Sequence, residues 1–285
     1  MFYLKLQPGP QLRSWVRSLW YCRAPGGPRR RERVLPDGCI QIILNLSRDH
    51  LTGCGEDGRL TLRLPPAIVV GARARFGFVD TADMDELAGI VIEPGGFPGL
   101  FRERADLFFE RATGLEAVWA CEGLTERLCE AATPLGKLRT LERLLSGLLN
   151  RGARRSGPVD QALHLFAEEG LSVSECARSV GLCERRLSQV FRECVGMAPK
   201  MWCRIRRFQA AARGLRQGAH VRWAELALAC GYYDQAHLAN DFRAFSGVDP
   251  TTYTRLRGHW HNHLPVPNSD FSKTAGPRSC QNEPP

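Results

Sequence analysis

Arg185 and Gln189 are the residues of this chain whose types and spacing are best suited to reading DNA bases. They are four residues apart, so a helix through this segment places both side chains on one face. An arginine donates two hydrogen bonds to the major-groove edge of guanine, and a glutamine pairs in the same way with adenine. Leu187 and Phe191 fall on the opposite face, as core residues would. The pattern predicts an amphipathic helix over residues 184–194 whose polar face carries Arg185 and Gln189.

The outward face of this predicted helix is polar. Its remaining arginines are suited to phosphates, whose contacts position a helix without reading sequence. The candidate DNA-contacting residues of this helix are Glu184, Arg185, Arg186, Ser188, Gln189 and Arg192. A solvated helix face is the alternative explanation for each of them.

The segment that contains this helix is repeated about 50 residues later. The landmarks Ala177, Gly181, Phe191-Arg192, Gly196 and Pro199 return as Ala227, Gly231, Phe242-Arg243, Gly247 and Pro250. In each copy a glycine separates two short apolar stripes at helical spacing, which is the helix-turn-helix pattern. Packing hairpins or part of a helical solenoid would explain one copy, but two copies with shared landmarks favour a pair of DNA-binding units.

The two copies differ at their starts. Ser172 with Glu175 three residues later predicts a capping box in the first copy. Arg222 stands in the place of Ser172 in the second copy, which predicts a weaker cap. A helix from Pro158 and a longer one over about residues 199–215 should lead into the two copies, the longer helix bracing them. The sequence therefore predicts an all-α domain of about 100 residues.

The most specific motif lies in the second copy. Gly231-Tyr-Tyr-Asp-Gln-Ala-His-Leu-Ala-Asn-Asp-Phe-Arg243, followed by Gly247-Val-Asp-Pro250-Thr-Thr-Tyr253, resembles the signature of the AraC/XylS family of bacterial transcription regulators. The resemblance covers roughly residues 158–257. It implies two recognition helices in successive major grooves about 34 Å apart. It also implies base contacts at the positions of Arg185 and Gln189.

The second recognition helix departs from the family at its outward face. Its candidate DNA-contacting residues are Gln235, Ala236, His237, Ala239, Asn240 and Arg243. The family often has serine in place of the two alanines and arginine in place of Asn240, so no guanine contact is implied here. Asn240 is suited to adenine and the alanines to thymine methyl groups. His237 is equally consistent with packing, phosphate contact and base reading.

The first half of the chain has a different pattern. Residues 1–23 carry apolar residues at helical spacing, and the run 29–33 after a Pro-Gly-Gly-Pro turn is expected to be a solvated loop. Strands are expected over residues 40–46, 60–64, 68–70 and 87–92. Helices are expected over residues 99–104, 115–120 and 124–149.

Two short motifs in this half, Leu35-Pro-Asp-Gly-Cys39 and Ile92-Glu-Pro-Gly-Gly96, resemble an amino-terminal domain of uncharacterised AraC-type regulators. The resemblance implies a small β-rich sensor with a helical dimerisation segment. A pocket in such a fold is the default ligand site. We expect it near Trp20, Arg33 and Cys39, although the spacing identifies no ligand.

The sequence thus predicts a multi-domain protein in which an α+β domain precedes an all-α domain with two helix-turn-helix units. The expected segments are a β-rich effector-sensing domain over 1–122, a helical dimerisation or connector segment over 123–151, a linker over 152–157, the DNA-binding domain over 158–258 and a disordered tail over 259–285.

Composition limits the classes of function. The chain of 285 residues has a formal net charge of +9, which favours a polyanionic partner, although the basic excess is shared by both halves. No stretch is long and apolar enough to span a membrane, and the amino terminus lacks a signal-peptide pattern. The eleven cysteines include no Cys-x-x-Cys pair, so we expect reduced core thiols in a cytoplasmic, nucleoid-associated protein.

Two other groups of residues could do chemistry. His259, His261 and His263 have a spacing that could bind a metal ion, but they follow the last predicted helix, so a solvated tail is favoured. Cys39 or Cys54 could be a redox sensor. Neither has a basic neighbour at helical spacing that would lower the pKa of its thiol, so this hypothesis is not favoured.

The acidic stretch Asp83-Met-Asp85-Glu86 is better explained as a solvated turn than as a general acid and base. We find no metal-ligand set, nucleophile elbow or phosphate loop, and so expect neither an enzyme nor a cofactor.

The resemblance implies a transcription regulator, with activation the commoner mode in the family. The expected partners are double-stranded promoter DNA, RNA polymerase, a small-molecule effector and a second copy of the chain. Two alternatives stay open. The first half could only dimerise a constitutive DNA binder, or it could be an enzymatic domain tethered to DNA-binding helices.

Overall fold

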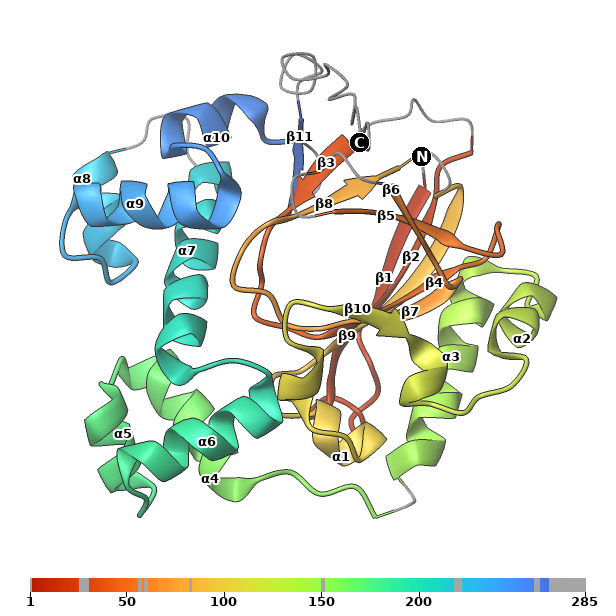
Figure 1. The fold of residues 1–285 in the computed structure, drawn as a ribbon, viewed down its shortest axis with the longest axis horizontal. Helices are drawn as coiled ribbons and strands as arrows, with labels where there is room; N and C mark the ends of the chain where they lie inside the picture. Colours follow the sequence, from red (N-terminus) through yellow and green to blue (C-terminus); the bar gives the residue numbers. More distant parts are fainter. Residues whose placement is uncertain are drawn as a thin grey trace, which may run out of the picture.

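The computed structural model of the chain describes residues 2–25, 31–55, 58, 61–81, 84–149, 152–217, 222–258 and 262–266. A β-rich half is followed by a helical half, as the sequence predicts. In the helical half, the long helix α7 (Pro199–Gln217) runs between two groups of shorter helices along one side of the molecule (Figure 1).

Within the described residues, the strands form two antiparallel sheets that curve around a common interior (Figure 1). The larger sheet has the order β1 (Phe2–Leu6), β2 (Val16–Arg23), β9 (Glu86–Ile92), β4 (Gln41–Asn45), β7 (Ala67–Val70) and β10 (Ala112–Gly114). The smaller sheet has the order β11 (His263–Pro265), β3 (Arg31–Val34), β8 (Gly77–Asp80), β5 (Leu51–Cys54) and β6 (Thr61–Leu64).

Alternate residues of the central strand β4 face two different interiors. Ile42 and Leu44 are fully buried, and Ile42 is paired in register with the equally buried Ile90 of β9. Gln41 and Ile43, on the opposite face, line a cavity between the sheets. This division follows from the two-residue period of a strand, which sends successive side chains to opposite faces.

The prediction of helical spacing over residues 1–23 is wrong, because these residues contain β1 and β2. The pairing of β2 with β9 shifts between Val16 and Ser18, which marks a β-bulge. The bulge places Val16, Ser18 and Leu19 all in buried positions, which disturbs the alternation expected of a strand. The expected loop over 29–33 is also wrong where the structure describes it, since residues 31–33 belong to β3.

The helices of the first half are shorter than predicted. They are α1 (Phe97–Phe101), the 3-10 turns η1 (Ala105–Phe108) and η2 (Leu115–Ala117), α2 (Leu124–Glu130) and α3 (Pro134–Leu149). The predicted helix over 124–149 is therefore interrupted. Its break precedes Pro134, whose ring disfavours helical backbone in the residue before it.

The leucine side chains along one face of α3 pack against other elements of the same chain. Leu138, Leu141 and Leu145 are fully buried in the main hydrophobic core, where α3 packs on β2, β1 and α1. Beneath α3, Lys137 donates to the carbonyl of Leu128 at 2.8 Å and lies 3.6 Å from the Glu86 carboxylate. This face of the predicted dimerisation segment serves the fold of its own chain.

The second half confirms the predicted helix-turn-helix repeat. Its helices are α4 (Gly157–His164), the π-helical turn η3 (Leu165–Glu169), α5 (Val173–Ser179), α6 (Glu184–Val195), α7, α8 (Trp223–Ala229), α9 (Gln235–Ser246) and α10 (Pro250–Leu256). Helices α5 and α6 are called unit 1, and helices α8 and α9 are called unit 2. Both parts of the predicted capping box between Ser172 and Glu175 are present, whereas Arg222 forms no side-chain cap.

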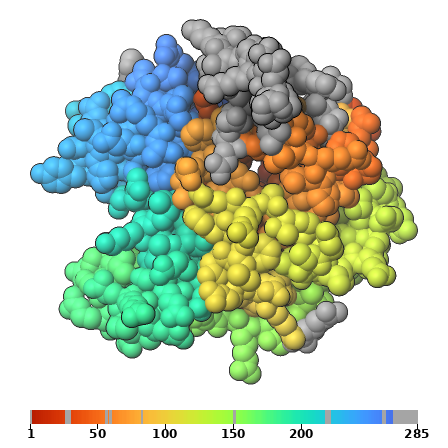
Figure 2. Space-filling view, viewed as in Figure 1, coloured from red at the N-terminus to blue at the C-terminus, as the bar shows by residue number. Residues whose placement is uncertain are grey.

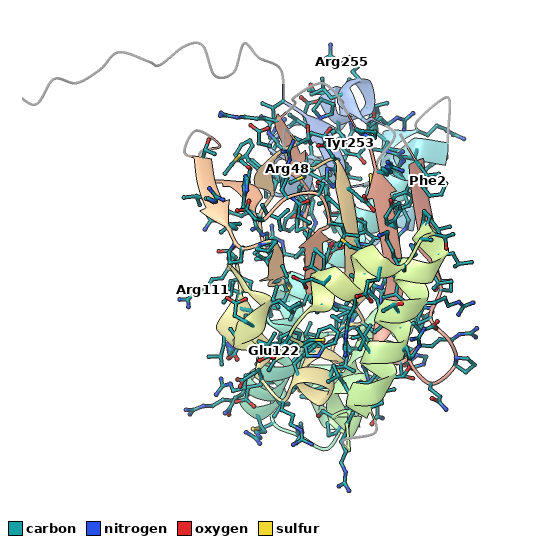
Figure 3. All side chains as sticks on the ribbon, turned by 90° about the vertical axis from the view of Figure 1, so that its right-hand side faces the viewer. Phe2, Arg48, Arg111, Glu122, Tyr253 and Arg255 are labelled. Carbon is teal, nitrogen blue, oxygen red and sulfur yellow. The ribbon has the colours of Figure 1, made fainter. Side chains whose placement is uncertain are left out.

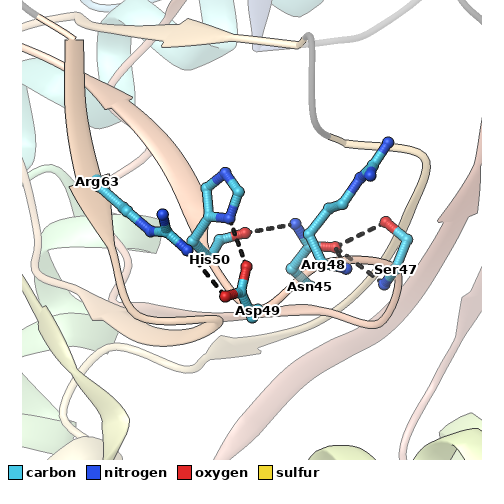
Figure 4. Close-up of polar contacts among 6 residues, drawn as sticks. All are labelled: Asn45, Ser47, Arg48, Asp49, His50 and Arg63. Carbon is cyan, nitrogen blue, oxygen red and sulfur yellow. Dashed lines mark hydrogen bonds and ion pairs between the residues drawn. The ribbon is translucent and has the colours of Figure 1, made fainter.

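A polar turn carries the chain from β4 in one sheet to β5 in the other (Figure 4). The buried Asn45 side chain accepts hydrogen bonds from the Ser47 and Arg48 amides and donates to the carbonyl of His50 at 2.7 Å. Asp49 accepts from Arg63 at 2.8 Å and lies 2.7 Å from the His50 ring nitrogen. These contacts satisfy the polar groups of the turn, so we assign it a structural role.

Residues 263–265 correct the prediction of a disordered tail over 259–285. They form β11, which pairs antiparallel with β3 although it follows the last helix of the second half. Asn262 and Val266 flank this strand, and the other residues of the predicted tail, including His259 and His261, lie outside the described residues. In the part of the chain that the structure describes, no helix is both long and apolar enough to cross a membrane.

Candidate DNA-binding surface and ligand cavity

Helix α6 presents the predicted reading surface of unit 1. Its apolar face is in the core, where Leu187 and Phe191 are fully buried. Arg185 and Gln189 are exposed on the other face, and Gln189 donates to the Glu193 carboxylate at 3.1 Å. Glu184, Arg186 and Arg192 are likewise exposed, and Ser188 is half-buried. The helix therefore holds a polar face rigidly outward on a packed scaffold.

Helix α9 presents the corresponding surface of unit 2. Its exposed residues include Gln235, Ala236, Asn240 and Arg243, whereas Ala239 is half-buried. His237 is also half-buried, and its ring meets the edge of the Tyr232 ring at a centroid distance of 5.1 Å. His237 thus has a packing contact within unit 2. Asp234 accepts from the His237 amide at 2.7 Å and caps the helix.

Helix α7 braces unit 2 through a charged contact. Asp241 of α9 is 2% exposed and accepts from Arg204 of α7 at 2.6 Å. The Arg204 guanidinium also lies 5.2 Å from the centre of the Phe245 ring. An ion pair with one carboxylate this deeply buried fixes the rotation of α9 against α7. Residue spacing gave no sign of this pair.

The two units form separate lobes along one side of the molecule, green to cyan for unit 1 and blue for unit 2 (Figure 2). Both lobes contact the β-rich half. At the end of α6, a Cβ on Gly196 would lie 3.2 Å from the carbonyl oxygen of Ala105 in η1. Arg104 lies 3.7 Å from the Glu193 carboxylate at the same contact. The β-rich half therefore touches helix α6 of unit 1 itself.

The segment after unit 2 has its own contacts. Tyr253 of α10 is buried and Arg255 is exposed, and Figure 3 labels both on this helix. A Cβ on Gly247, between α9 and α10, would lie 2.8 Å from the Phe76 ring of the β-rich half. Close approach at this glycine, whose φ is +73°, holds the end of α9 against the loop before β8.

The predicted linker is a docked segment. Arg155 binds both carboxylate oxygens of Asp160 at 2.9 Å, the carbonyl of Pro94 at 2.8 Å and the carbonyl of Ser14. Its guanidinium lies 5.7 Å from the centre of the Trp15 ring. These contacts join α4 to the β-rich half and restrict movement at residues 152–157.

A cavity of about 1860 Å³ lies between the sheets and is closed on one side by the helical half. Its inner wall is largely apolar, with Leu51, Ile68 and Leu87 forming a small buried cluster beside it. From the helical half, Trp202, Arg206 and Gln209 of α7 line the cavity, together with residues of α4. A molecule in this cavity would contact both halves of the chain.

Two of the three predicted pocket residues line this cavity. Trp20 lies over Gly89, where a Cβ would approach the indole to 2.2 Å, so the missing side chain makes room for the ring. Cys39 lines the cavity as well. Arg33 does not line it; its guanidinium lies 5.5 Å from the Phe76 ring centre.

Charged groups gather at the rim of the cavity. Arg17 donates to Glu93 at 2.7 Å, and Gln41 donates to Asp37 at 3.0 Å. The Nε atom of Arg73 is buried without a hydrogen bond from any described residue; burial lowers the pKa of this guanidinium, and the Glu110 carboxylate opposes that shift.

Arg206 of α7 adds to the positive charge at the rim. Burial lowers the pKa of Arg206, the Glu168 carboxylate opposes this shift, and repulsion from Arg213 and Arg17 adds to it. The guanidinium lies 5.1 Å from the centre of the Trp202 ring. An anion at this rim would meet guanidinium groups from both halves.

The other candidate chemistries find no support in the described residues. Burial raises the pKa of Cys39 well above its ordinary value and also raises that of Cys54, which disfavours reactive thiolates. No group of three metal-binding side chains occurs in the described ranges. In the acidic stretch, Asp83 lies outside those ranges, Asp85 pairs with Arg48, and Glu86 accepts from Tyr21 at 2.9 Å.

Comparison with known proteins matches both halves to families. The model of a helix-turn-helix domain matches residues 176–256, and that of a domain of unknown function (DUF6597) matches residues 4–113. The chain is 33% identical over 94 residues to the HTH-type transcriptional activator AarP of Providencia stuartii. This match covers 33% of the chain and 68% of AarP.

Two solved structures are also similar. A transcriptional regulator from Chromobacterium violaceum, of the AraC-type DNA-binding domain-containing proteins, is 25% identical, with a TM-score of 0.32 over 36% of this chain and 93% of that chain. ToxT from Vibrio cholerae is 9% identical, with a TM-score of 0.49 over 90% of this chain and 98% of that chain.

Proposed function

Because the chain belongs to the AraC family of DNA-binding transcription regulators, we propose that α6 and α9 read successive major grooves of promoter DNA. The family consists of regulators and not of enzymes, so an enzymatic first half is not proposed. The observation that carries the proposal is the outward exposure of Arg185 and Gln189 on a helix whose opposite face is fully buried.

The proposal assigns different tasks to the exposed residues of α6. Arg185 reads guanine and Gln189 reads adenine, while Arg186 and Arg192 bind phosphates. In unit 2, Asn240 reads adenine and Ala236 meets a thymine methyl group. The relative AarP is named an activator, and we propose activation through contact with RNA polymerase for this chain also.

Selection of bound sequences from random duplexes tests the reading roles. Arg185→Ala should weaken binding by about 1–3 kcal/mol and relax the preference at one base pair. Arg192→Ala should weaken binding to all sequences and lower the salt dependence by about one phosphate contact. Arg143→Ala, an exposed arginine of α3, is the matched control. An Arg185→Ala protein with unchanged sequence preference would reject the base-reading role.

We further propose that the cavity binds an effector with an apolar body and an anionic group. The apolar part of the wall suits the body, and the guanidinium groups of Arg73 and Arg206, which both line the cavity, suit the anion. Contact with Arg206 on α7 gives the effector a direct route to the DNA-binding helices. A purely dimerising first half would have no such use for the cavity.

A pair of matched probes tests this second part. A medium-chain aliphatic carboxylate should raise the melting temperature more than the alcohol of the same length, because only the carboxylate pairs with the rim. Arg206→Met should remove the advantage of the carboxylate, while Arg143→Met should keep it. Equal effects of the acid and the alcohol on the unsubstituted protein would contradict an anionic effector.

A further inference from the structure

Strand β11 joins the end of the DNA-binding half to the sensor half. It follows α10 in the chain, yet Leu264 pairs with Arg33 of β3 and is fully buried. Beyond the ladder, the Leu35 amide donates to the carbonyl of Asn262 at 2.8 Å, and the Val266 amide donates to the carbonyl of Arg31 at 3.0 Å. A segment of five described residues thus forms a continuous edge to the smaller sheet.

Two side chains tie this segment down further. The His263 ring nitrogen lies 2.7 Å from the Glu32 carboxylate of β3. Gln209 of α7 donates to the Asn262 side chain at 3.1 Å and to the carbonyl of Pro36 at 2.7 Å. The buried side-chain amide of Gln209 therefore connects three parts of the chain, namely α7, the β-rich half and the segment after α10.

The same segment is part of the cavity wall. Asn262, His263 and Pro265 line the cavity on one side, beside Glu32 and Gln209. One short strand is therefore at once an edge of the sensor sheet, a wall of the cavity and the continuation of the chain from α10. Unit 1 contacts the sensor through α6 and η1, away from this strand.

We propose that β11 is a strap through which occupancy of the cavity controls the position of unit 2. The inference rests on the proposed function, in which the cavity binds an anionic apolar ligand and unit 2 binds DNA. A ligand that touches Asn262, His263 or Pro265 binds the paired and released forms of the strap with different affinity and so shifts their populations. Release removes the pairing that ties the segment after α10 to the smaller sheet and leaves unit 2 with its contact at Gly247 and Phe76, while unit 1 keeps its contact with η1.

Hydrogen exchange on the full chain measures the strap directly, with 1-anilinonaphthalene-8-sulfonate as the anionic apolar probe. The reporters are the amides of Leu35 and Val266, which donate between β3 and the strap. Saturating probe should change their exchange rates by about fivefold. The Gly196 amide, bonded to Arg192 at the end of α6, should not change. Probe binding without any change at Leu35 and Val266 overturns the strap.

Linkage to DNA gives the second arm of the experiment. The probe should change the affinity of the unsubstituted protein for its selected duplex by about fivefold. Leu264→Asp, which places a charge at the buried centre of the strap, should abolish this change. Leu135→Asp should preserve it, because Leu135 is 47% exposed on α3. If Leu264→Asp fails to fold, the double variant Asn262→Ala/His263→Ala removes the two side-chain ties instead.

The two ideas fail in different ways. An equal shift of DNA affinity by the probe in Leu264→Asp and Leu135→Asp overturns the strap and leaves the proposed function standing. Failure of the unsubstituted protein to select any duplex, or to bind the probe, overturns the proposed function and the strap with it.

Discussion

Unit 1 and unit 2 share a helical scaffold but are held in the protein by different contacts. The recognition helix of unit 1 ends directly against the β-rich half, where Gly196 approaches Ala105. The recognition helix of unit 2 is instead pinned to α7 by the buried Asp241 and its partner Arg204. The β-rich half therefore contacts unit 1 at the end of α6, and it contacts unit 2 at Gly247 and through α7 and β11.

The capping of the helices differs in a related way. In unit 1 a side chain caps the first helix, α5, through Ser172, and α6 has no side-chain cap. In unit 2 the first helix, α8, lacks a side-chain cap, and Asp234 caps the recognition helix α9. The repeat thus preserves the helices and their turns, while the groups that fix each helix have changed between copies.

Breaking the buried ion pair should have the largest effect. Arg204→Met leaves the Asp241 carboxylate buried without its cation, so the free energy of unfolding should fall by about 3 kcal/mol in urea titration. Val190 occupies the place of Asp241 in unit 1, so Arg204→Met combined with Asp241→Val makes unit 2 resemble unit 1. The double variant should recover most of the loss; no recovery would mean that the two residues act independently.

The second-largest effect should come from substitutions on the surfaces that read DNA, and it should be separate for the two units. Asn240→Ala should cost about 1 kcal/mol in DNA affinity and relax one position in the half-site of unit 2. The half-site of unit 1, read by Arg185, should keep its preference. Sequence selection with both variants separates the two half-sites. Loss of preference across the whole site in Asn240→Ala would show that the units do not read separately.

Substitution of the residues at the helix caps should change the free energy of unfolding by a smaller amount. The change should have opposite signs in the two units. Ser172→Ala should lower the free energy of unfolding by about 1 kcal/mol because the Glu175 amide loses its acceptor. Arg222→Ser places a serine three residues before Glu225 and should raise it by about 0.5 kcal/mol. Thermal unfolding of both variants measures the difference. A destabilised Arg222→Ser protein would contradict the capping argument.

The smallest effect should be that of acid on a cap that only the second copy has. Hydrogen bonds from the Thr252 backbone and side chain lower the pKa of Asp249 below its ordinary value of 3.8. The cap therefore contributes fully above that value and is lost as pH falls through the lowered pKa. Ala198 holds the corresponding place in the first copy. Asp249→Asn should flatten this part of the stability–pH curve; an unchanged curve would exclude Asp249 as its source.

The helical half could be predicted because its determinants are local. Ser172 and Glu175 are three residues apart and cap the same turn, and Gly181 adopts the left-handed conformation that ends the first helix of the hairpin. The exposed positions of Arg185 and Gln189 follow from the helical period and the burial of Leu187. Their contact with DNA is still a prediction.

The β-rich half was harder to predict because its determinants are not local. The bulge at Val16 gave β2 the spacing of a helix, and only pairing with β9 identifies it as a strand. Arg31 and Arg33 looked like a solvated run, yet β8 and β11 pair with their strand on both sides. A strand has no hydrogen bonds of its own, so partners distant in sequence decide where it forms.

By itself the sequence determined the helix-turn-helix repeat and the polar faces of its recognition helices, because period, caps and turns act within a few residues. Only the tertiary structure decided that α3 buries its leucines, that Arg155 docks the linker and that His263 lies in a strand of the smaller sheet. The cavity was also decided only by the tertiary structure, because its walls come from strands, α4, α7 and β11. Such a site exists only once segments far apart in the chain have packed together.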